Sequence, residues 1–431
     1  MDYRTSKLEA LDSHDLRRFS GAASSLQSND PDVRVDRPTS VFYIVGGLSI
    51  GGTERHLSLI LPELKRRGLT PRVCVLDVQG EMARPIRDAG IEIDDWTKFL
   101  GQFSARRIRL FEPLVSLALV VRLGLAMRRL KPDICHAFLP KACILGGLAA
   151  WLAGHRCFVA SRRSQNTYLA RHRFSGVIEK FLMRGAAAVL GNSHAVVSEL
   201  SADGVPGDRL GLIHNGAELR PLPNDHERAA FRRNEGIGED DLVLLTVANL
   251  LPYKGHRDLI EAVIGTCKDL PQPWRLILVG RDDGIRASLE ERAAEAGIAG
   301  NLHFVQDRCD LESLYQAADI AILPSHEEGF PNAVIEAMGA GLPVIATNVG
   351  GIPDAIEHGR TGLIVPPHRP AALGDAILEL ARDPVRCELF GRNGRAKIEA
   401  EFSLPLCVDR YVRLYQGLAA AKPRIVSELV S

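Results

Sequence analysis

The sequence predicts an α/β protein built from two tandem doubly wound domains with a cleft between them. Strand-like and helical segments alternate along nearly the whole chain, which is typical of parallel sheets with helices on both faces. The alternation pauses at residues 215–224, a segment with two prolines, and then starts again. The chain has 431 residues, 46% of them apolar and 25% charged, so each of two domains can bury its own core.

The first domain is expected at residues 39–220. A glycine-rich turn follows its first strand, and strands and helices then alternate up to the proline-containing linker candidate. The predicted strands are 40–45, 71–76, 133–137, 158–161, 188–192 and 210–214, with helices at 53–67 and 142–153.

Two further segments of this domain leave a choice open. The apolar run 111–127 contains Glu112, Pro113 and Arg122, and it falls short of the roughly 20 apolar residues that a spanning helix needs. We expect a helix packed on the domain, with a helix lying on a membrane surface as the alternative. Residues 171–184 are basic and amphipathic, so they suit either contact with an anionic bilayer or packing on the domain.

The second domain is expected at residues 221–403. Residues 404–431 are expected to form a C-terminal helix and tail that cross back toward the first domain. Residues 1–38 are polar and lack the apolar core of a signal peptide, so we expect a disordered tail. The predicted strands of the second domain are 242–248, 275–279, 301–305, 320–323, 343–347 and 362–365, with helices at 256–267 and 371–381.

Charge and cysteine content exclude several kinds of protein. Lys and Arg together number 53, as do Asp and Glu, so the formal net charge is zero. A nucleic-acid-binding protein would carry a basic surplus, and we therefore expect no nucleic-acid partner. The 8 cysteines are scattered without a C-x-x-C pair, which indicates reduced thiols in a cytoplasmic protein. Neither H-E-x-x-H nor a Cys/His cluster occurs, so we expect no metal ion and no cofactor.

The segment after the strand at 320–323 carries the strongest functional signal. From Ser325 it reads Ser-His-Glu-Glu-Gly-Phe-Pro-Asn-Ala-Val-Ile-Glu. A helix is expected to begin near Pro331 or Asn332, because proline is favoured in the first turn and asparagine can cap a helix. The backbone N–H groups and the dipole at a helix start favour a phosphate.

Two carboxylates of this segment suit hydroxyl groups. A carboxylate accepts hydrogen bonds from a vicinal diol, so Glu336 can hold a ribose and Glu328 can face a sugar ring. Spacing alone favours the alternative equally, with Glu328 solvated and Glu336 on a helix surface.

Two other turns between a strand and a helix are candidates for the same site. Lys254 can neutralise a leaving diphosphate, although an exposed lysine at a helix start is the alternative. Residues 46–55 form a glycine-rich turn that matches neither G-x-G-x-x-G nor a P-loop. Gly51 and Gly52 would let the backbone approach a ligand closely, and a tight turn alone is the alternative.

The run from Glu328 to Glu336 resembles the E-G-F-x-x-x-x-x-E signature of glycosyltransferase family 4, the "glycosyl transferases group 1" enzymes of GT-B fold. The resemblance covers residues 41–402, and the segments 340–346 and 350–354 also match closely. It implies two Rossmann-like domains, with the nucleotide-sugar donor held by the second.

The resemblance also implies residue roles. Glu336 is expected on the nucleotide ribose, Glu328 on donor-sugar hydroxyls and Lys254 on the diphosphate. Gly51 and Gly52 are placed at the cleft, near the donor phosphates and the acceptor. The backbone that lines the sugar and the diphosphate is expected to come from Gly329, Phe330, Pro331 and Asn332.

Some positions depart from the pattern of the family or resemble it only weakly. Asn249 stands where many members carry an arginine, so Lys254 or another arginine must supply the missing charge. His136 resembles a histidine at a strand end that touches the donor sugar or positions an acceptor. Arg162 and Arg163 resemble cleft positions that meet a phosphate or an anionic acceptor, with a solvated basic face as the alternative.

The sequence therefore predicts a retaining glycosyltransferase that moves a sugar, by frequency a UDP-linked hexose, to a hydroxyl of a glycan or lipid-linked glycan. Lys254, Glu328 and His136 are its expected catalytic residues, and the nucleotide sugar is a substrate. Polysaccharide or glycolipid biosynthesis is the expected setting, in the cytoplasm with peripheral contact at the inner face of the plasma membrane. The alternatives are a nucleotide-sugar epimerase of similar fold and a non-catalytic nucleotide-sugar-binding partner subunit.

Overall fold

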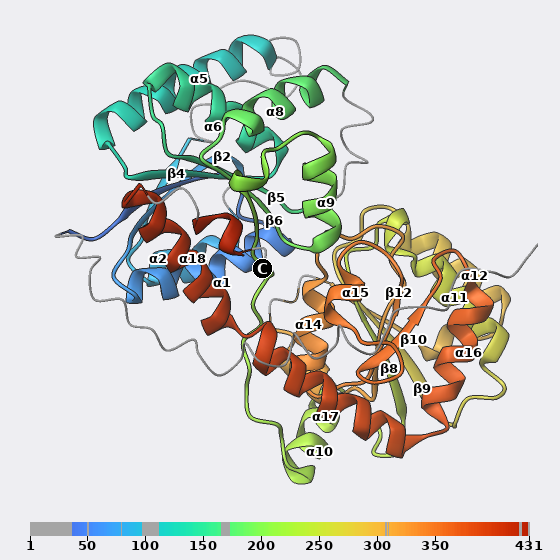
Figure 1. Cartoon of the computed structure of the whole chain (residues 1–431). Helices are drawn as coiled ribbons and strands as arrows, with labels where there is room; N and C mark the ends of the chain where they lie inside the picture. Colours follow the sequence, from blue (N-terminus) through green and yellow to red (C-terminus); the bar gives the residue numbers. More distant parts are fainter. Residues whose placement is uncertain are drawn as a thin grey trace, which may run out of the picture. The chain divides into compact units, whose positions relative to one another are not determined.

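Two parallel sheets, each covered by helices, form the framework of the chain (Figure 1). The structure is a computed structural model that describes residues 37–49, 51–78, 80–96, 112–164, 173–306, 308, 310–421 and 425–429. Residues 38–431 make up one compact unit. The tail expected at 1–38 lies almost wholly outside the described residues.

The first sheet has seven strands in the order β3-β2-β1-β4-β5-β6-β7. Neighbouring strands are parallel throughout, so all their carboxyl ends lie at one edge. The strand order reverses between β1 and β4, and ligands of such sheets bind at this switch point. The strands are β1 (Ser40–Gly47), β2 (Thr70–Val78), β3 (Glu92–Asp95), β4 (Ile134–Phe138), β5 (Phe158–Arg162), β6 (Ala188–Gly191) and β7 (Leu210–Leu212).

Helices cover both faces of this sheet because its central strands bury side chains on both sides. Along β1, Tyr43 and Val45 belong to one core, and Phe42 and Ile44 belong to the other. The helices are α1 (Gly52–Arg66), α2 (Ala83–Asp88), α5 (Glu112–Leu130), α6 (Pro140–Ala153), α8 (Arg173–Gly185), α9 (His194–Ala202) and α18 (Leu404–Ala419). Side chains of α1, α2 and α18 fill the first core, and those of α5, α6 and α9 fill the second.

The second sheet has six parallel strands in the order β10-β9-β8-β11-β12-β13, with its own switch point between β8 and β11. The strands are β8 (Leu242–Val247), β9 (Trp274–Val279), β10 (Leu302–Val305), β11 (Ile320–Leu323), β12 (Val344–Thr347) and β13 (Gly362–Val365). Around them lie α10 (Asp225–Asn234), α11 (His256–Thr266), α12 (Arg286–Glu295), α13 (Glu312–Ala317), α14 (Asn332–Gly339), α15 (Ile352–Ala355), α16 (Pro370–Ala381) and α17 (Pro384–Glu401).

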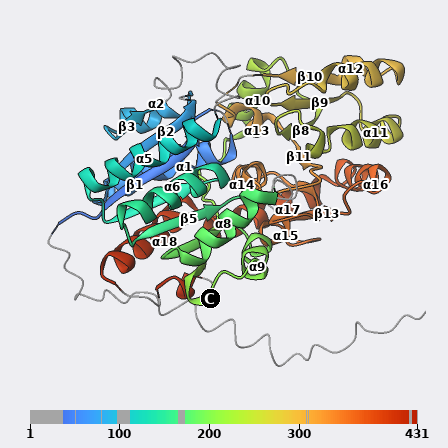
Figure 2. The same cartoon turned by 90° about the horizontal axis from the view of Figure 1, so that it is seen from above.

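The chain passes between the two sheets twice, and the two passages are hydrogen-bonded to each other. The backbone N–H of Ala217 donates to the carbonyl of Phe402 at 2.8 Å, and Leu404 N–H donates to the Ala217 carbonyl at 2.8 Å. After this crossing, α18 packs against α1 and β4 of the first sheet, whereas α17 packs against α14 (Figures 1 and 2). The last helix is thus part of the core of the first sheet.

Two features of the first sheet refine what the sequence predicted. The strand β3 was not predicted, because Glu-Ile-Asp-Asp is polar and lies at the sheet edge, where only one neighbouring strand is needed. Residues 112–127 of the predicted apolar run lie in α5, which packs on α6 and buries Leu119, Leu123 and Met127, while residue 111 lies outside the described residues. In the part of the chain that the structure describes, no helix is long and apolar enough to cross a membrane.

Candidate functional site

Glu328 lies in the loop after β11, which with β8 forms the central pair of strands in the second sheet. Its Oε1 accepts a hydrogen bond from Lys254 Nζ at 2.7 Å and another from Ser325 Oγ at 2.7 Å. Lys254 ends a short 3-10 helix, η2 (Pro252–Lys254), that follows β8, and Glu328 follows β11. The charges meet because β8 and β11 are neighbours and both loops leave the same edge.

A glycine permits the two loops to approach each other. Gly255 has a φ of +72°, and a Cβ there would overlap the carbonyl of Pro324, so a side chain would separate the loops. The backbone N–H of His326 donates to the Tyr253 carbonyl at 2.7 Å and holds the loops together. The predicted turn Lys254-Gly255 thus fixes the position of the lysine relative to Glu328.

The helix α14 begins as the sequence predicts, but Asn332 does not cap it. Pro331 is the N-cap residue and Asn332 is the first helical residue. The Asn332 side chain reaches across to the first domain, where Nδ2 donates to the Gly52 carbonyl at 2.8 Å. Its Oδ1 accepts a hydrogen bond from Asn215. Asn332 therefore links the start of α14 to the glycine-rich turn and to the linker.

Glu336 lies on α14 and is 14% exposed. Arg55 of α1 approaches it from the first domain, with 2.5 Å between Arg55 Nε and Glu336 Oε1. The Tyr315 hydroxyl donates to Oε2 at 3.1 Å, and burial together with the nearby carboxylate raises the pKa of Tyr315 well above its usual value. The carboxylate predicted to bind the ribose is thus held by Tyr315 and faces a cation of the other domain.

Arg163 is nearly buried between the two domains. Its guanidinium donates to the Asn215 side chain and, at 3.4 Å, to the hydroxyl of Tyr411 on α18. A Cβ at Gly329 would overlap the Arg163 carbonyl, so the loop before α14 lies directly against this arginine's backbone. Arg163 is therefore close to the predicted donor loop, and Phe330, next to Gly329, is buried in the core of the second sheet.

The structure places Arg162 on the opposite side of the sheet. Its side chain is 2% exposed, and it donates to Asp203 Oδ2 at 2.8 Å and lies 3.6 Å from Glu179. Arg162 is the last residue of β5 and Arg163 follows it directly, and successive residues of an extended backbone point to opposite sides, so the two arginines face different sides of the sheet. The expected contact of Arg162 with a phosphate is not supported by this arrangement.

His136 is completely buried as well. One ring nitrogen lies 2.7 Å from the Tyr415 hydroxyl of α18, and the other lies 2.8 Å from Ser161 Oγ. Burial, with a contribution from the positive charge of Arg163, holds the pKa of His136 well below its usual value. A catalytic contact with a substrate would need an accessible ring, so the geometry supports a positioning role between β4, β5 and α18.

The side chain of Asn249 contacts another loop of the second domain. Its Oδ1 accepts a hydrogen bond from the backbone N–H of Arg281 at 3.2 Å, which joins the loop after β8 to the loop after β9. Two arginines of the first domain approach the part of the second domain that contains α14. Arg55 contacts Glu336 of α14 and the Arg163 backbone lies against the loop before α14. Arg55 was not among the residues predicted for the site.

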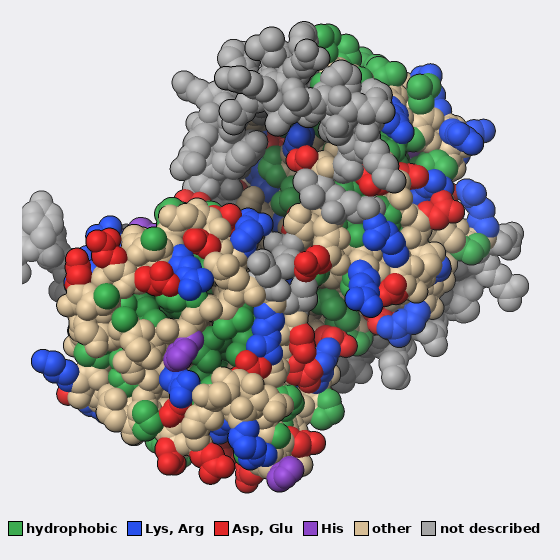
Figure 3. Space-filling view, turned by 180° about the vertical axis from the view of Figure 1, so that it is seen from behind, with side chains coloured by type: hydrophobic (Ala, Val, Ile, Leu, Met, Phe, Trp, Pro, Cys, Tyr) green, Lys and Arg blue, Asp and Glu red, His purple; other side chains and the backbone are tan. Residues whose placement is uncertain are grey.

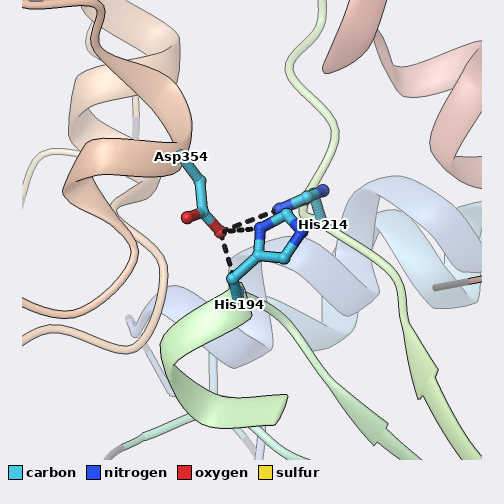
Figure 4. A group of neighbouring side chains, drawn as sticks. All are labelled: His194, His214 and Asp354. Atoms are coloured by element: carbon cyan, nitrogen blue, oxygen red, sulfur yellow. Dashed lines mark hydrogen bonds and ion pairs between the residues drawn. The ribbon is translucent and has the colours of Figure 1, made fainter. Parts of the chain in front are cut away.

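A second contact between the domains gathers two histidines around a carboxylate (Figure 4). Asp354 Oδ2 lies 3.0 Å from His214 Nε2 and 3.1 Å from His194 Nδ1, and it also accepts the His194 backbone N–H at 2.8 Å. Burial tends to raise the pKa of Asp354, but the hydrogen bonds from His214 and His194 outweigh it and lower the pKa. Sequence reasoning missed this group because its members lie on α9, after β7 and on α15.

These three residues have the donor atoms of a metal site, since their ligand atoms lie within 4.8 Å of one another. Their mutual hydrogen bonds account for the arrangement without an ion. A second group with such a spacing consists of Asp258, His326 and His368.

A cavity of about 650 Å³ lies apart from these contacts. It sits against β9 and β10 at the edge of the second sheet, where Arg275, Arg286 and His303 contribute to its lining. None of the predicted site residues lines it. The size of a cavity therefore does not identify the site, whereas the convergence of charged side chains at the switch point does.

Comparisons with known proteins agree with this arrangement. The family model "Glycosyltransferase Family 4" matches residues 50–220, and "Glycosyl transferases group 1" matches residues 227–397. The first match covers β2 to β7 of the seven-stranded sheet, and the second covers all six strands of the second sheet and the loop before α14. The fold and the site define the GT-B class of two-domain proteins. Within it, the chain belongs to the glycosyltransferases of group 1, family 4.

Curated relatives carry the name D-inositol 3-phosphate glycosyltransferase. The one from Corynebacterium glutamicum is 36% identical over 41% of this chain and 44% of its own. The one from Jonesia denitrificans is 31% identical over 54% of this chain and 62% of its own. The chain thus spans about half the length of these relatives. The Corynebacterium diphtheriae protein is 26% identical over 88% of this chain and 93% of its own.

Solved structures share the fold at lower identity. HepE from Anabaena, in complex with UDP-glucose, superposes with a TM-score of 0.75 at 21% identity, over 87% of this chain and 99% of HepE. Sucrose-phosphate synthase from Thermosynechococcus elongatus gives a TM-score of 0.70 at 23% identity, over 89% of this chain and 100% of its own. Both likenesses concern the fold alone.

Proposed function

We propose that the chain transfers a sugar from a nucleoside-diphosphate sugar, most simply a UDP-sugar, to an acceptor hydroxyl with retention of anomeric configuration. The observation that carries this proposal is the contact of Lys254 with Glu328 at the switch point of the second sheet, with Glu336 on α14, the helix that follows the Glu328 loop. HepE, whose structure was solved with UDP and with UDP-glucose, has the same fold and supports the choice of donor.

Each side chain has a role that follows from its charge. Glu336 holds the ribose diol, and Glu328, kept in place by Ser325 and Lys254, faces hydroxyls of the sugar. Lys254 binds Glu328, and its ammonium group can also stabilise the negative charge of the departing diphosphate. The start of α14 adds backbone N–H groups and the positive end of its dipole.

The proposed reaction needs little acid–base chemistry from the protein. The bond from the anomeric carbon to the diphosphate oxygen breaks while the acceptor oxygen bonds to the same face of that carbon. The acceptor proton passes to the departing phosphate. The protein positions the reactants and stabilises the leaving charge, and contacts such as Asn332 to Gly52 bring the acceptor domain against the donor. This route uses neither a cofactor nor a metal ion.

The acceptor is proposed as a glycan or a lipid-linked glycan. The names of the curated relatives indicate an alternative acceptor, a phosphorylated inositol. An assay with UDP-glucose as donor would therefore include both classes of acceptor. We expect release of UDP and a glycosylated product with one class of acceptor. With Glu336→Ala, donor binding should weaken at least about tenfold, because the ribose loses two hydrogen bonds of about 1 kcal/mol each.

The two rival functions give different results in the same assay. An epimerase would convert the donor without any acceptor, so donor alone would yield a new nucleotide sugar. A non-catalytic subunit would bind UDP-glucose without turnover with every acceptor. Binding of UDP-glucose that is the same in the wild type and in Glu336→Ala would contradict the donor site itself.

A further inference from the structure

The large apolar side chains that the described part of the chain exposes are concentrated on three helices. Seven such side chains are more than half exposed, and six of them lie on α5, α6 and α8, namely Leu114, Leu117, Leu125, Trp151, Val177 and Phe181. The seventh, Val385, lies on α17. This concentration is unusual for a monomeric surface, where exposed apolar side chains are normally scattered singly.

The three helices form one continuous face. α6 packs against both α5 and α8, and the Arg128 guanidinium of α5 donates to the Leu152 carbonyl of α6 at 2.8 Å. Along α5, Leu114, Leu117 and Leu125 are exposed whereas Leu119 and Leu123 are buried, so the helix has an apolar outer stripe as well as its buried face. In Figure 3, hydrophobic side chains lie beside Lys and Arg side chains at the upper margin, where Figure 1 places α5. We call the exposed outer side of these helices the α5–α6–α8 face.

The charge of this face has one sign, although the chain as a whole is neutral. In residues 114–131, 140–156 and 176–185, every exposed charged side chain is an arginine or a lysine. The acidic residue of these ranges, Glu179, is buried beside Arg162. Arg129 and Lys131 at the end of α5 and Lys141 at the start of α6 are exposed members of the basic set.

We propose that the α5–α6–α8 face docks on the surface of an anionic lipid bilayer. Apolar side chains entering the boundary of headgroups and acyl chains gain the hydrophobic free energy, and the basic side chains meet lipid phosphates. The same charges disfavour a second copy as the partner, because a two-fold interface would set this basic face against itself. The proposal is independent of the chemistry assigned to the donor site.

The orientation of the helices links this surface to the cleft. The strand β4 ends at Phe138 and α6 begins at Pro140, so the start of α6 lies at the carboxyl edge of the first sheet. This is the edge at which Gly52 meets Asn332. A bilayer under the α5–α6–α8 face would therefore lie near the edge of the first sheet that contacts the second domain.

Vesicle flotation with the whole chain tests the proposal. The probes are vesicles of phosphatidylcholine alone and of an equimolar mixture of phosphatidylcholine and phosphatidylglycerol. We expect the wild type to float with the anionic vesicles. Leu117→Gln with Phe181→Gln should weaken this binding about tenfold or more for each side chain removed. Arg129→Gln with Lys131→Gln should weaken it about fivefold per residue and only with anionic lipid.

The matched control changes Val385 and Leu389 of α17 to Gln, since these two are also exposed and apolar but lie outside the face. Binding of the control that equals the wild type supports the proposal. A wild type that stays unbound with both vesicles overturns it, and so does an equal loss in the control. Sedimentation velocity gives a further outcome: a dimer that Leu117→Gln with Phe181→Gln dissociates, without vesicle binding, would identify the face as a protein interface and overturn the proposal.

Discussion

Arg55 and Glu336 form an ion pair between the two domains, with 2.5 Å between Nε and Oε1. The pair joins α1, which packs on the seven-stranded sheet, to α14, which packs on the six-stranded sheet. The carboxylate is the one proposed to hold the donor ribose. Under this proposal, a bound nucleoside would share Glu336 with the arginine or displace the arginine from it.

Replacement of Arg55 by methionine should increase the affinity for uridine. The pair is partly exposed, and such pairs contribute up to about 1 kcal/mol, so the gain should be at most about fivefold. Calorimetric titration with uridine measures it. Arg66→Met is the control, since Arg66 is an exposed arginine of the same helix. Unchanged or weaker uridine binding in Arg55→Met would show that Arg55 supports the nucleoside and does not compete with it.

Replacement of Lys254 by methionine should lower turnover about a hundredfold or more at saturating donor, because a preorganised charge near the leaving group is lost. Lys254→Arg should retain part of the rate, although a planar guanidinium fits a point-charge position less well. The exposed Lys268 provides the control when it is changed to methionine. A rise in KM with unchanged kcat would mean that Lys254 contributes to binding and not to the departure of the diphosphate.

Gly329→Ala should weaken the contact between the domains. The added Cβ would overlap the backbone carbonyl of Arg163, so the loop before α14 has to move away. We expect turnover to fall at least about tenfold, the size of effect that a misplacement of the reacting groups can cause, while the unfolding temperature changes little. The control is Gly300→Ala, which has open space for a Cβ. A normal rate in Gly329→Ala would indicate that the contact is not needed for catalysis.

Stability should depend on the protonation of buried histidines. Burial lowers the pKa of His56 and His136 well below the usual value and that of His256 to about 4. The folded state keeps these rings neutral, whereas the unfolded chain takes up protons below about pH 6.5. The stabilisation is therefore complete above about pH 6.5 and is lost as the pH falls toward 4, at up to about 1.4 kcal/mol per pH unit for each histidine.

Urea denaturation at a series of pH values measures this dependence. His256→Asn should reduce the slope by one histidine's share, whereas a change of the exposed His226 to Asn should leave it unaltered. An identical slope in His256→Asn would show that the ring of His256 is not the neutral, buried group that the geometry describes.

Much of the fold could be predicted from local patterns. The strands of both sheets, apart from β3, and the helices α1, α6, α11 and α16 follow from the alternation of apolar and polar residues, because a parallel strand buried on both faces leaves a continuous apolar run. β3 was not predicted because its sequence is polar, and a strand with a single neighbour at the sheet edge does not need a continuous apolar run. The loop from Ser325 to Glu336 and the turn at Lys254-Gly255 were also recognisable, since their glycines and charges follow strand ends directly.

The direction of a side chain was decided by the tertiary structure. Arg162 and Arg163 are adjacent and chemically identical. Arg162, the last residue of β5, points into the core beside Asp203, whereas Arg163, directly after the strand, faces Asn215. His136 became a buried link because Tyr415, far away in the chain, covers it.

By itself, the sequence determined the class of fold, the family and the segments of the proposed donor site, because these depend on residues that are neighbours in the chain. The partners of those segments depended on the tertiary structure. Arg55 reaches Glu336, and His194 and His214 reach Asp354, only after the linker and the return of α18 bring the two sheets together. Contacts of this kind are set by packing between distant elements, and no local pattern in the sequence encodes them.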